Sequence, residues 1–238
     1  MIKNEKMIKD FNLYARSEHG ISTLKNEEYI KHLIKTNNMS FTNAYIEPTI
    51  VEERQMNMSL ISVYSRLFMD RVLILGTEID SDVNNIVSAQ LMYLNSISDE
   101  DIQMHINSNG GSVIDGLAIL DTMNFINASV STICRGMCAS MASVLLSAGE
   151  KGKRFALPHG SIMIHQVSGG TGRAQCSDVQ IVAQEMKRTQ DTLYKILSDN
   201  TGKSIEEITK DADRDYWMTS QEALDYGIID EIIRKEKR

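Results

Sequence analysis

A serine within a run of small residues is the best candidate nucleophile in this sequence. Ser140 lies in the segment Gly136-Met-Cys-Ala-Ser-Met-Ala142, between an expected strand and an expected helix. N–H groups at the start of a helix lack intrahelical partners, so the N–H of Met141 could stabilise an oxyanion that forms beside Ser140. Gly111, which follows Gly110 at the end of another expected strand, could supply a second donor because no side chain obstructs its N–H. These residues are suited to nucleophilic catalysis.

A serine hydroxyl needs a neighbouring base to take its proton, and the sequence contains five histidines. His165 is the best candidate because it ends an expected strand and precedes a glycine-rich segment, where its side chain can face a cleft. The other histidines lie in the polar N-terminal segment, inside an apolar strand or in a turn: His19, His32, His105 and His159. An acid that orients the imidazole could be any of three aspartates, and spacing does not choose among Asp211, Asp213 and Asp215.

The elements that must position these residues follow an alternating pattern. From Val72 onward, short β-branched runs alternate with helical periodicity, which predicts one α/β domain. Strands are expected at 71–75, 102–106, 130–134, 161–165 and 228–232. Helices are expected at 82–94, from the Gly110-Gly111 turn to 127, at 140–149, at 177–198, and from Thr219 to Gly227. Capping boxes are predicted for Ser177 with Gln180 and for Thr219 with Glu222.

Composition excludes several classes of protein. The chain has 238 residues, of which 42% are hydrophobic, and a net charge of −7 without a long Lys/Arg block, so nucleic acid is not an expected partner. No stretch approaches the roughly 18 consecutive apolar residues of a membrane span, and the N-terminus lacks a secretory signal, so a cytoplasmic location is expected. The cysteines Cys134, Cys138 and Cys176 lack metal-ligand spacing, and we expect buried or partly buried free thiols.

Several short motifs in a fixed order across most of the chain are similar to those of one enzyme family. They are Tyr64-Ser-Arg-Leu67, Asp70-Arg71, Ile106-Asn-Ser-Asn-Gly-Gly111, Asp121-Thr-Met-Asn-Phe-Ile126, Ser131-Thr-Ile-Cys134, Gly136 to Met141, Gly152-Lys-Arg154, Met163-Ile-His-Gln166 and Asp213-Arg-Asp215. Together they resemble the proteolytic subunit of Clp protease (ClpP), and the likeness runs from about residue 45 to residue 233.

The resemblance assigns roles to the candidate residues. It implies that Ser140 is the nucleophile, His165 the base and Asp215 the orienting acid, with Gly111 and Met141 as oxyanion donors. It also implies a crotonase-like (ClpP) α/β fold of repeated β-β-α units with a protruding strand–helix handle. Residues 1–44 would be a polar leader, propeptide or tail, cut near Ala44 or Tyr45 if the chain matures as the family does. Residues 45–238 would form the peptidase domain, with 45–63 as its axial N-terminal segment.

The resemblance further implies an ATP-dependent serine endopeptidase that cleaves unfolded polypeptides to short peptides inside a closed chamber. The chamber would consist of two stacked heptameric rings of identical subunits, fed by an AAA+ unfoldase such as a ClpX-like or ClpA/ClpC-like ATPase. This chemistry requires no metal or organic cofactor, and ATP would bind the partner because this chain lacks a phosphate-binding Gly-x-x-x-x-Gly-Lys-Ser/Thr loop. Two alternatives remain: a related acyl-CoA hydratase or isomerase, which would use glutamates and is disfavoured by the triad, and a non-catalytic or regulatory ring subunit.

The sequence departs from the family at several positions. The family's usual prolines are replaced by Asn109 and Val167, and the segment after His165 is one residue longer than expected. The family's unfoldase-docking cleft carries aromatic or apolar residues at three positions that are polar in this chain: Gln103, His105 and Arg135. Phe125 and Ile133 would remain as its apolar wall. We therefore expect altered recognition of the unfoldase.

Overall fold

The computed structural model describes residues 49–54 and 57–235. The expected leader at 1–44 and the beginning of the expected axial segment lie outside the described residues. The described part of the axial segment forms two antiparallel strands, β1 and β2, in which Thr49 pairs with Ser62. Whether the leader is removed therefore stays a prediction.

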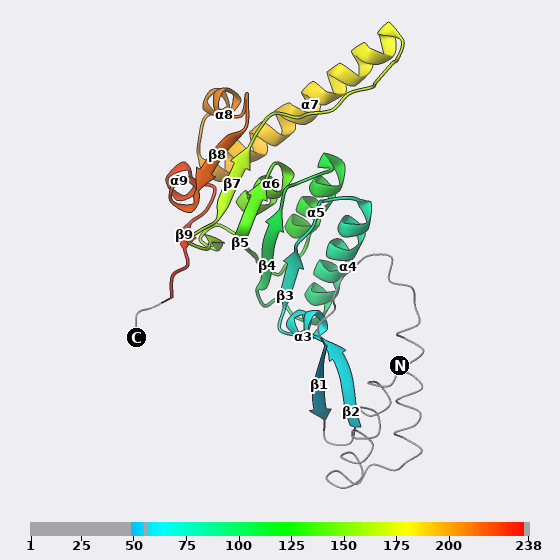
Figure 1. Cartoon of the computed structure of the whole chain (residues 1–238), viewed down its shortest axis with the longest axis vertical. Helices are drawn as coiled ribbons and strands as arrows, with labels where there is room; N and C mark the ends of the chain where they lie inside the picture. The colour runs from blue at the N-terminus through cyan, green and yellow to red at the C-terminus, as the bar shows by residue number, and fades with distance from the viewer. Residues whose placement is uncertain (1–48, 55–56, 236–238) are drawn as a thin grey trace, which may run out of the picture. The chain divides into compact units, whose positions relative to one another are not determined.

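The described residues form the alternating pattern of strands and helices that the sequence predicts (Figure 1). The strands are β1 (Thr49–Arg54), β2 (Asn57–Ser62), β3 (Val72–Leu75), β4 (Ile102–Ser108), β5 (Val130–Ala139), β6 (Arg154–Ala156), β7 (Ser161–Ile164), β8 (Tyr216–Thr219) and β9 (Glu231–Ile232). The helices are α3 (Val63–Met69), α4 (Ser81–Ile97), α5 (Val113–Phe125), α6 (Met141–Ser147), α7 (Cys176–Thr201), α8 (Ile205–Asp211) and α9 (Ser220–Tyr226). The predicted α/β fold class is confirmed.

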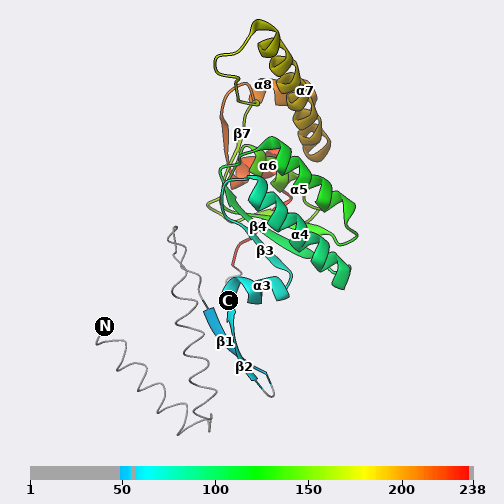
Figure 2. The same cartoon turned by 90° about the vertical axis from the view of Figure 1, so that its right-hand side faces the viewer.

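The central sheet is parallel except at one edge. Its strand order is β3-β4-β5-β6-β9, while β7 pairs with the last part of β5 and β8 pairs antiparallel with β7. In parallel units connected through a helix, successive crossovers have the same hand and place their helices on one face. Helices α4 and α5 accordingly lie side by side against the sheet (Figure 2).

The core lies between this sheet and helices α4, α5 and α6. Along β4 every second residue is buried, beginning with Ile102, so one face of the strand packs inward. Leu91 of α4, Ile119 of α5 and Leu145 of α6 are fully buried. Each such side chain contributes about 1.5–3 kcal/mol by leaving water. The core therefore fixes the strand ends that carry the candidate site.

Helix α7 is packed along only part of its length. Its buried residues, Leu193, Tyr194 and Leu197, all lie in its C-terminal half, whereas Val179 and Ile181 are exposed. Figure 1 shows the N-terminal part of α7 and the segment before it extending away from the sheet. This is the protruding handle expected from the family resemblance, although residues 165–175, which lead into its helix, form no strand. Among the described residues, no helix has the length and apolar character needed to cross a membrane.

The helix termini confirm one of the two predicted capping boxes and contradict the other. The capping box at Thr219 and Glu222 is present, and Gly227 ends α9 with a φ of 93°. The capping box predicted at Ser177 is wrong: α7 begins at Cys176, and its N-cap residue Gln175 makes no side-chain capping bond. Cys176 is also exposed, contrary to the expectation of buried thiols, whereas the other two cysteines are buried.

Two strands, β9 and β5, differ most in length from the prediction. β9 covers only Glu231–Ile232, because the N–H of Ile228 donates instead to the carbonyl of Ala223 at the end of α9, 3.0 Å away. β5 continues to Ala139, five residues beyond its predicted end at Cys134. This extension delivers the chain to Ser140.

Candidate active site

Ser140 occupies a sharp turn between β5 and α6. Its φ of 55° and ψ of −127° lie outside the regions that residues with a side chain normally adopt. The N–H of Ser140 donates to the carbonyl of Met163, 2.9 Å away, and the carbonyl of Ser140 accepts from the side chain of Ser143 at 2.6 Å. Strained strand-to-helix turns of this kind expose a nucleophilic serine in other hydrolases. The surrounding hydrogen bonds hold this conformation.

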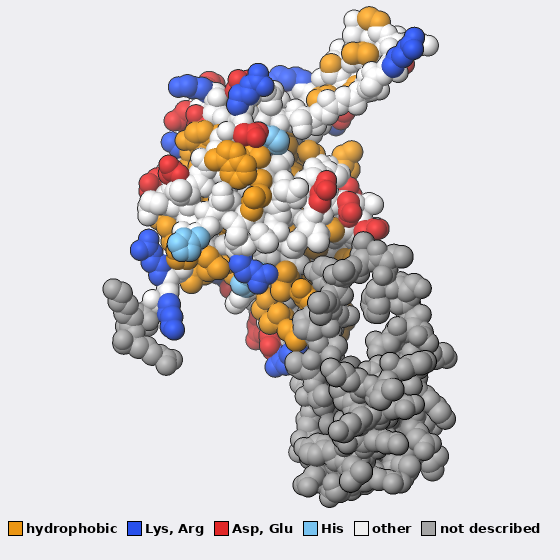
Figure 3. All heavy atoms as spheres, viewed as in Figure 1, with side chains coloured by type: hydrophobic (Ala, Val, Ile, Leu, Met, Phe, Trp, Pro, Cys, Tyr) orange, Lys and Arg blue, Asp and Glu red, His pale blue; other side chains and the backbone are white. Residues whose placement is uncertain are grey.

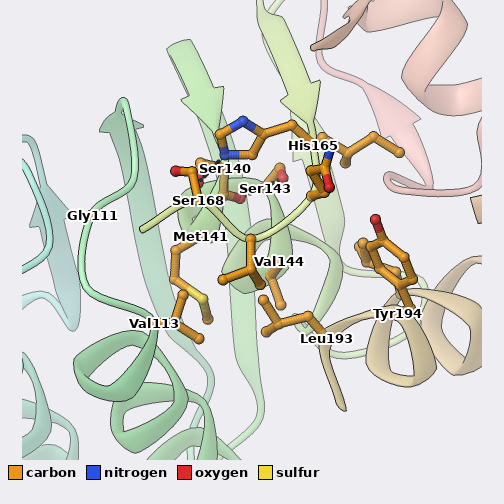
Figure 4. Close-up of a pocket in the computed structure, with 14 residues that line it drawn as sticks. Gly111, Val113, Ser140, Met141, Ser143, Val144, His165, Ser168, Leu193 and Tyr194 are labelled. Carbon is orange, nitrogen blue, oxygen red and sulfur yellow. Dashed lines mark hydrogen bonds between the residues drawn. The ribbon is translucent and has the colours of Figure 1, made fainter. Parts of the chain in front are cut away.

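The strand pairing brings His165 and Asp215 to Ser140. β7 lies parallel to β5 with Met163 opposite Ala139, and β8 lies antiparallel to β7 with Tyr216 opposite Ile164. Ser140, His165 and Asp215 therefore each lie one residue beyond the last paired residue of their strand. The Nε2 atom of His165 is 2.8 Å from the Oγ of Ser140, and its Nδ1 atom is 3.2 Å from the Oδ1 of Asp215. Figure 4 shows the imidazole directed toward Ser140.

The structure distinguishes the three aspartates that spacing left open. The carboxylate of Asp211 accepts a hydrogen bond from the hydroxyl of Tyr226 at 3.1 Å, where burial and this carboxylate raise the pKa of the tyrosine. The backbone carbonyl of Asp213 accepts from the side chain of Gln166. Of the three, Asp215 is the one whose carboxylate reaches His165, although its side chain remains 61% exposed.

The two expected oxyanion donors both border the candidate site. Gly111 forms a parallel bridge with Ile79. Its φ is 146°, and a Cβ at this position would lie 2.3 Å from the carbonyl oxygen of Ile79, so only glycine fits. In the described part of the chain, neither the N–H of Gly111 nor that of Met141 donates a hydrogen bond to a protein group. Both groups are therefore available to a ligand beside Ser140.

A pocket adjoins these residues, and its wall is polar and apolar in nearly equal parts. It is lined by Val113 of α5, Val144 of α6 and Leu193 and Leu197 of α7, in addition to the residues already described (Figure 4). Sequence patterns do not single out these residues as the lining of a site. Their helical periodicity predicts one inward-facing side, but it does not show that part of this side borders a cavity instead of the core.

The expected docking-cleft residues lie on the sheet and at the end of α5. His105 of β4 lies between Ile74 of β3 and Ile133 of β5. Its Nδ1 atom is buried and has no hydrogen-bond partner in the described part of the chain, and burial, followed by the charge of Arg135, lowers its pKa. Gln103 and Arg135 are exposed, and so is Phe125. Ile133 is only 5% exposed, so in the single chain it lies in the core.

Charge on the surface is mixed. On the face shown in Figure 3, lysine and arginine side chains alternate with acidic ones and form no continuous basic area. A binding surface for a phosphate backbone would concentrate positive charge on one face. Among the described residues, no group of three or more His, Cys, Asp or Glu side chains is placed to hold a metal ion.

The site contains a serine that is hydrogen-bonded to a histidine–aspartate pair, and two free N–H groups lie beside it. On an α/β fold this is the arrangement of a serine hydrolase. The family model for Clp protease matches residues 54–236. Similar proteins named "ATP-dependent Clp protease proteolytic subunit" include one from Porphyromonas gingivalis, which is 48% identical over 230 residues, or 96% of this chain and 99% of its own length. Others are from Bacteroides fragilis, 53% identical over 193 residues (81% and 93%), and Ligilactobacillus salivarius, 49% identical over 192 residues (80% and 97%). The chain belongs to the Clp protease family and is a serine peptidase.

Proposed function

We propose that this chain is the proteolytic subunit of an ATP-dependent Clp protease and cleaves unfolded polypeptides through Ser140, His165 and Asp215. The observation that carries the proposal is the 2.8 Å approach of His165 Nε2 to the Oγ of a serine on a strained turn. A hydroxyl in this position can transfer its proton to the imidazole as it attacks a carbonyl carbon. No metal or organic cofactor takes part in this reaction.

The reaction has two halves. Ser140 Oγ bonds to the peptide carbonyl carbon while His165 Nε2 takes the hydroxyl proton, and the N–H groups of Gly111 and Met141 stabilise the oxyanion. His165 then protonates the leaving amine, and an acyl-enzyme remains. Water, deprotonated by His165, releases the acid product and restores Ser140. Asp215 accepts a hydrogen bond from Nδ1–H and so keeps the tautomer that leaves Nε2 free to accept.

The nucleophile can be tested directly by substitution. Ser140→Ala should abolish cleavage of a small fluorogenic peptide and labelling by a serine-directed phosphonate, without altering the size of the oligomer. Ser96→Ala is the matched control and should retain both, because it removes an exposed hydroxyl that, among the described residues, bonds only to the carbonyl of Tyr93. A wild-type protein that neither cleaves nor reacts would instead support the alternative of a non-catalytic ring subunit.

Assembly and partners extend the proposal. Exposed apolar side chains recur along α4, at Ile86, Met92, Tyr93 and Ile97, as expected of a surface that packs against other subunits. We propose two stacked heptameric rings that enclose the active sites, in the cytoplasm. The names of the relatives specify ATP dependence, and this chain lacks a phosphate-binding loop. An AAA+ unfoldase would therefore bind and hydrolyse the ATP and deliver unfolded protein.

The proposed docking cleft favours a polar partner loop. An apolar loop that covers Gln103, His105 and Arg135 would cost about 1–3 kcal/mol for each polar group left unpaired. In the described part of the chain the guanidinium of Arg135 has no ion-pair partner, so a carboxylate on the partner could pair with it. We propose that the unfoldase presents polar or acidic loop residues here, or that a second, different ring provides the docking surface.

A further inference from the structure

The backbone ladder that aligns β7 with β8 ends before the residues of the proposed triad. Its last pair is Ile164 with Tyr216, and His165 and Asp215 lie one residue beyond it. The carboxylate of Asp215 is 61% exposed, so packing does little to hold it. The 3.2 Å separation between its Oδ1 and His165 Nδ1 is at the long end of the range for hydrogen bonds. A further interaction is needed to keep the acid in place.

A side-chain hydrogen bond lies immediately beyond this last pair. The Nε2 of Gln166 donates to the backbone carbonyl of Asp213 over 2.6 Å. The donor adjoins the proposed base in the sequence, and the acceptor lies two residues before the proposed acid. Because the acceptor is a carbonyl oxygen, only the NH2 group of the amide can satisfy this contact. The bond therefore ties the chain that leaves β7 to the chain that enters β8.

We propose that Gln166 is a positioning residue that holds the 213–215 segment against the end of β7 and thereby keeps the carboxylate of Asp215 on His165. This inference rests on the proposed peptidase function. Gln166 does not touch the reacting atoms. It acts through Asp215, whose effect on the reaction depends on its distance from the imidazole.

Loss of the bond should affect the reaction more than substrate binding. A displacement of about 1 Å in a catalytic group costs roughly a hundredfold in rate. Gln166→Met keeps a side chain of similar length without the donor, and Gln166→Glu offers only acceptor oxygens near neutral pH. We expect kcat to fall about tenfold to a hundredfold in both variants, with KM changed less than about twofold.

A double-mutant cycle separates positioning from a general structural role. If Gln166 acts through Asp215, adding Gln166→Met to Asp215→Ala should change kcat by less than about twofold, because the group being positioned is already absent. The matched control is Gln221→Met, which removes an exposed amide bonded to Asp225 on α9 and should leave kcat unchanged. Gln166→Met with wild-type kcat, or a loss that persists in full in the Asp215→Ala background, would overturn the proposal.

A crystal structure of Gln166→Met gives a second readout that does not depend on activity. The carboxylate of Asp215 should lie beyond hydrogen-bonding distance of His165 Nδ1 in this variant, and an undisplaced carboxylate contradicts the proposal. If the wild-type protein proved inactive, the proposed function would fail, and this structure would still decide the role of Gln166.

Discussion

A methyl group added at Gly110 should displace the nucleophile, Ser140. A Cβ at this position would lie 2.7 Å from the Cβ of Ser140, 2.7 Å from the carbonyl oxygen of Ala139 and 2.9 Å from the backbone nitrogen of Met141. None of these atoms belongs to the end of a flexible side chain. Carbon atoms in contact are separated by about 3.5 Å or more, so Gly110→Ala requires a shift of roughly 0.8 Å between the turn and Ser140.

The expected effect follows from this displacement. A shift approaching 1 Å at the nucleophile lowers the rate by roughly a hundredfold. The φ of Gly110 is 93°, so alanine also introduces backbone strain of about 1–3 kcal/mol. This backbone strain would lower the stability of the protein without moving Ser140. Its effect must therefore be measured separately from the effect of the displacement.

Gly152 provides the matched control. Its φ is 85°, close to that of Gly110, but a Cβ there would meet nothing within 4 Å. Gly152→Ala should therefore lower the melting temperature by a similar mechanism while peptide hydrolysis stays at the wild-type rate. Hydrolysis, phosphonate labelling and thermal unfolding of both variants are the measurements. Equal hydrolysis rates in the two variants would refute the argument that the turn at Gly110 supports the nucleophile.

Three further predictions concern stability, the N-terminus and docking. Burial acts to raise the pKa of Asp230, but hydrogen bonds from the nearly buried Arg154 outweigh it and lower the pKa below its ordinary 3.8. Asp230→Asn should lower the free energy of unfolding by about 3–5 kcal/mol at pH 7, as measured by urea titration. The difference between wild type and variant should shrink below pH 3.8, because the wild-type carboxylate then takes up a proton. Deletion of residues 1–44 should leave the fold intact, and mass spectrometry of fully active rings that found an intact Met1 would contradict cleavage near Ala44 or Tyr45. Acyldepsipeptide-type ligands, which carry an aromatic ring and an acyl tail, should bind the docking cleft weakly, and calorimetry that gives a Kd well below about 1 µM would disprove the polar character of the cleft.

The fold class and the pairing of chemical groups could be predicted because they depend on local patterns. Alternating strand and helix periodicity predicts the parallel sheet, and the small residues around Ser140 indicate a turn. Spacing could not choose the acid, because the distance from His165 to Asp215 depends on the antiparallel register of β7 and β8. The wall of the pocket was missed for the same reason: Val144 and Leu193 come from different helices, and only the packing of α6 against α7 brings them together.

The most consequential error was the end of β5, and its cause also explains how the site is assembled. Arg135-Gly136 has the composition of a strand end, yet the chain forms a bulge opposite Asn107, whose Oδ1 accepts the N–H of Met137 at 3.0 Å. Gly136 adopts a φ of 100° there, and a Cβ would lie 2.6 Å from the same oxygen.

Before the bulge β5 pairs with β6, and after it β5 pairs with β7. β6 ends at Ala156, which lies opposite Cys134, so the part of β5 beyond the bulge has β7 as its neighbour on that side. The change of partner sets Ala139 opposite Met163 and therefore places Ser140 within reach of His165. The continuation of β5 past the bulge, which sequence patterns do not indicate, thus brings the nucleophile to its base.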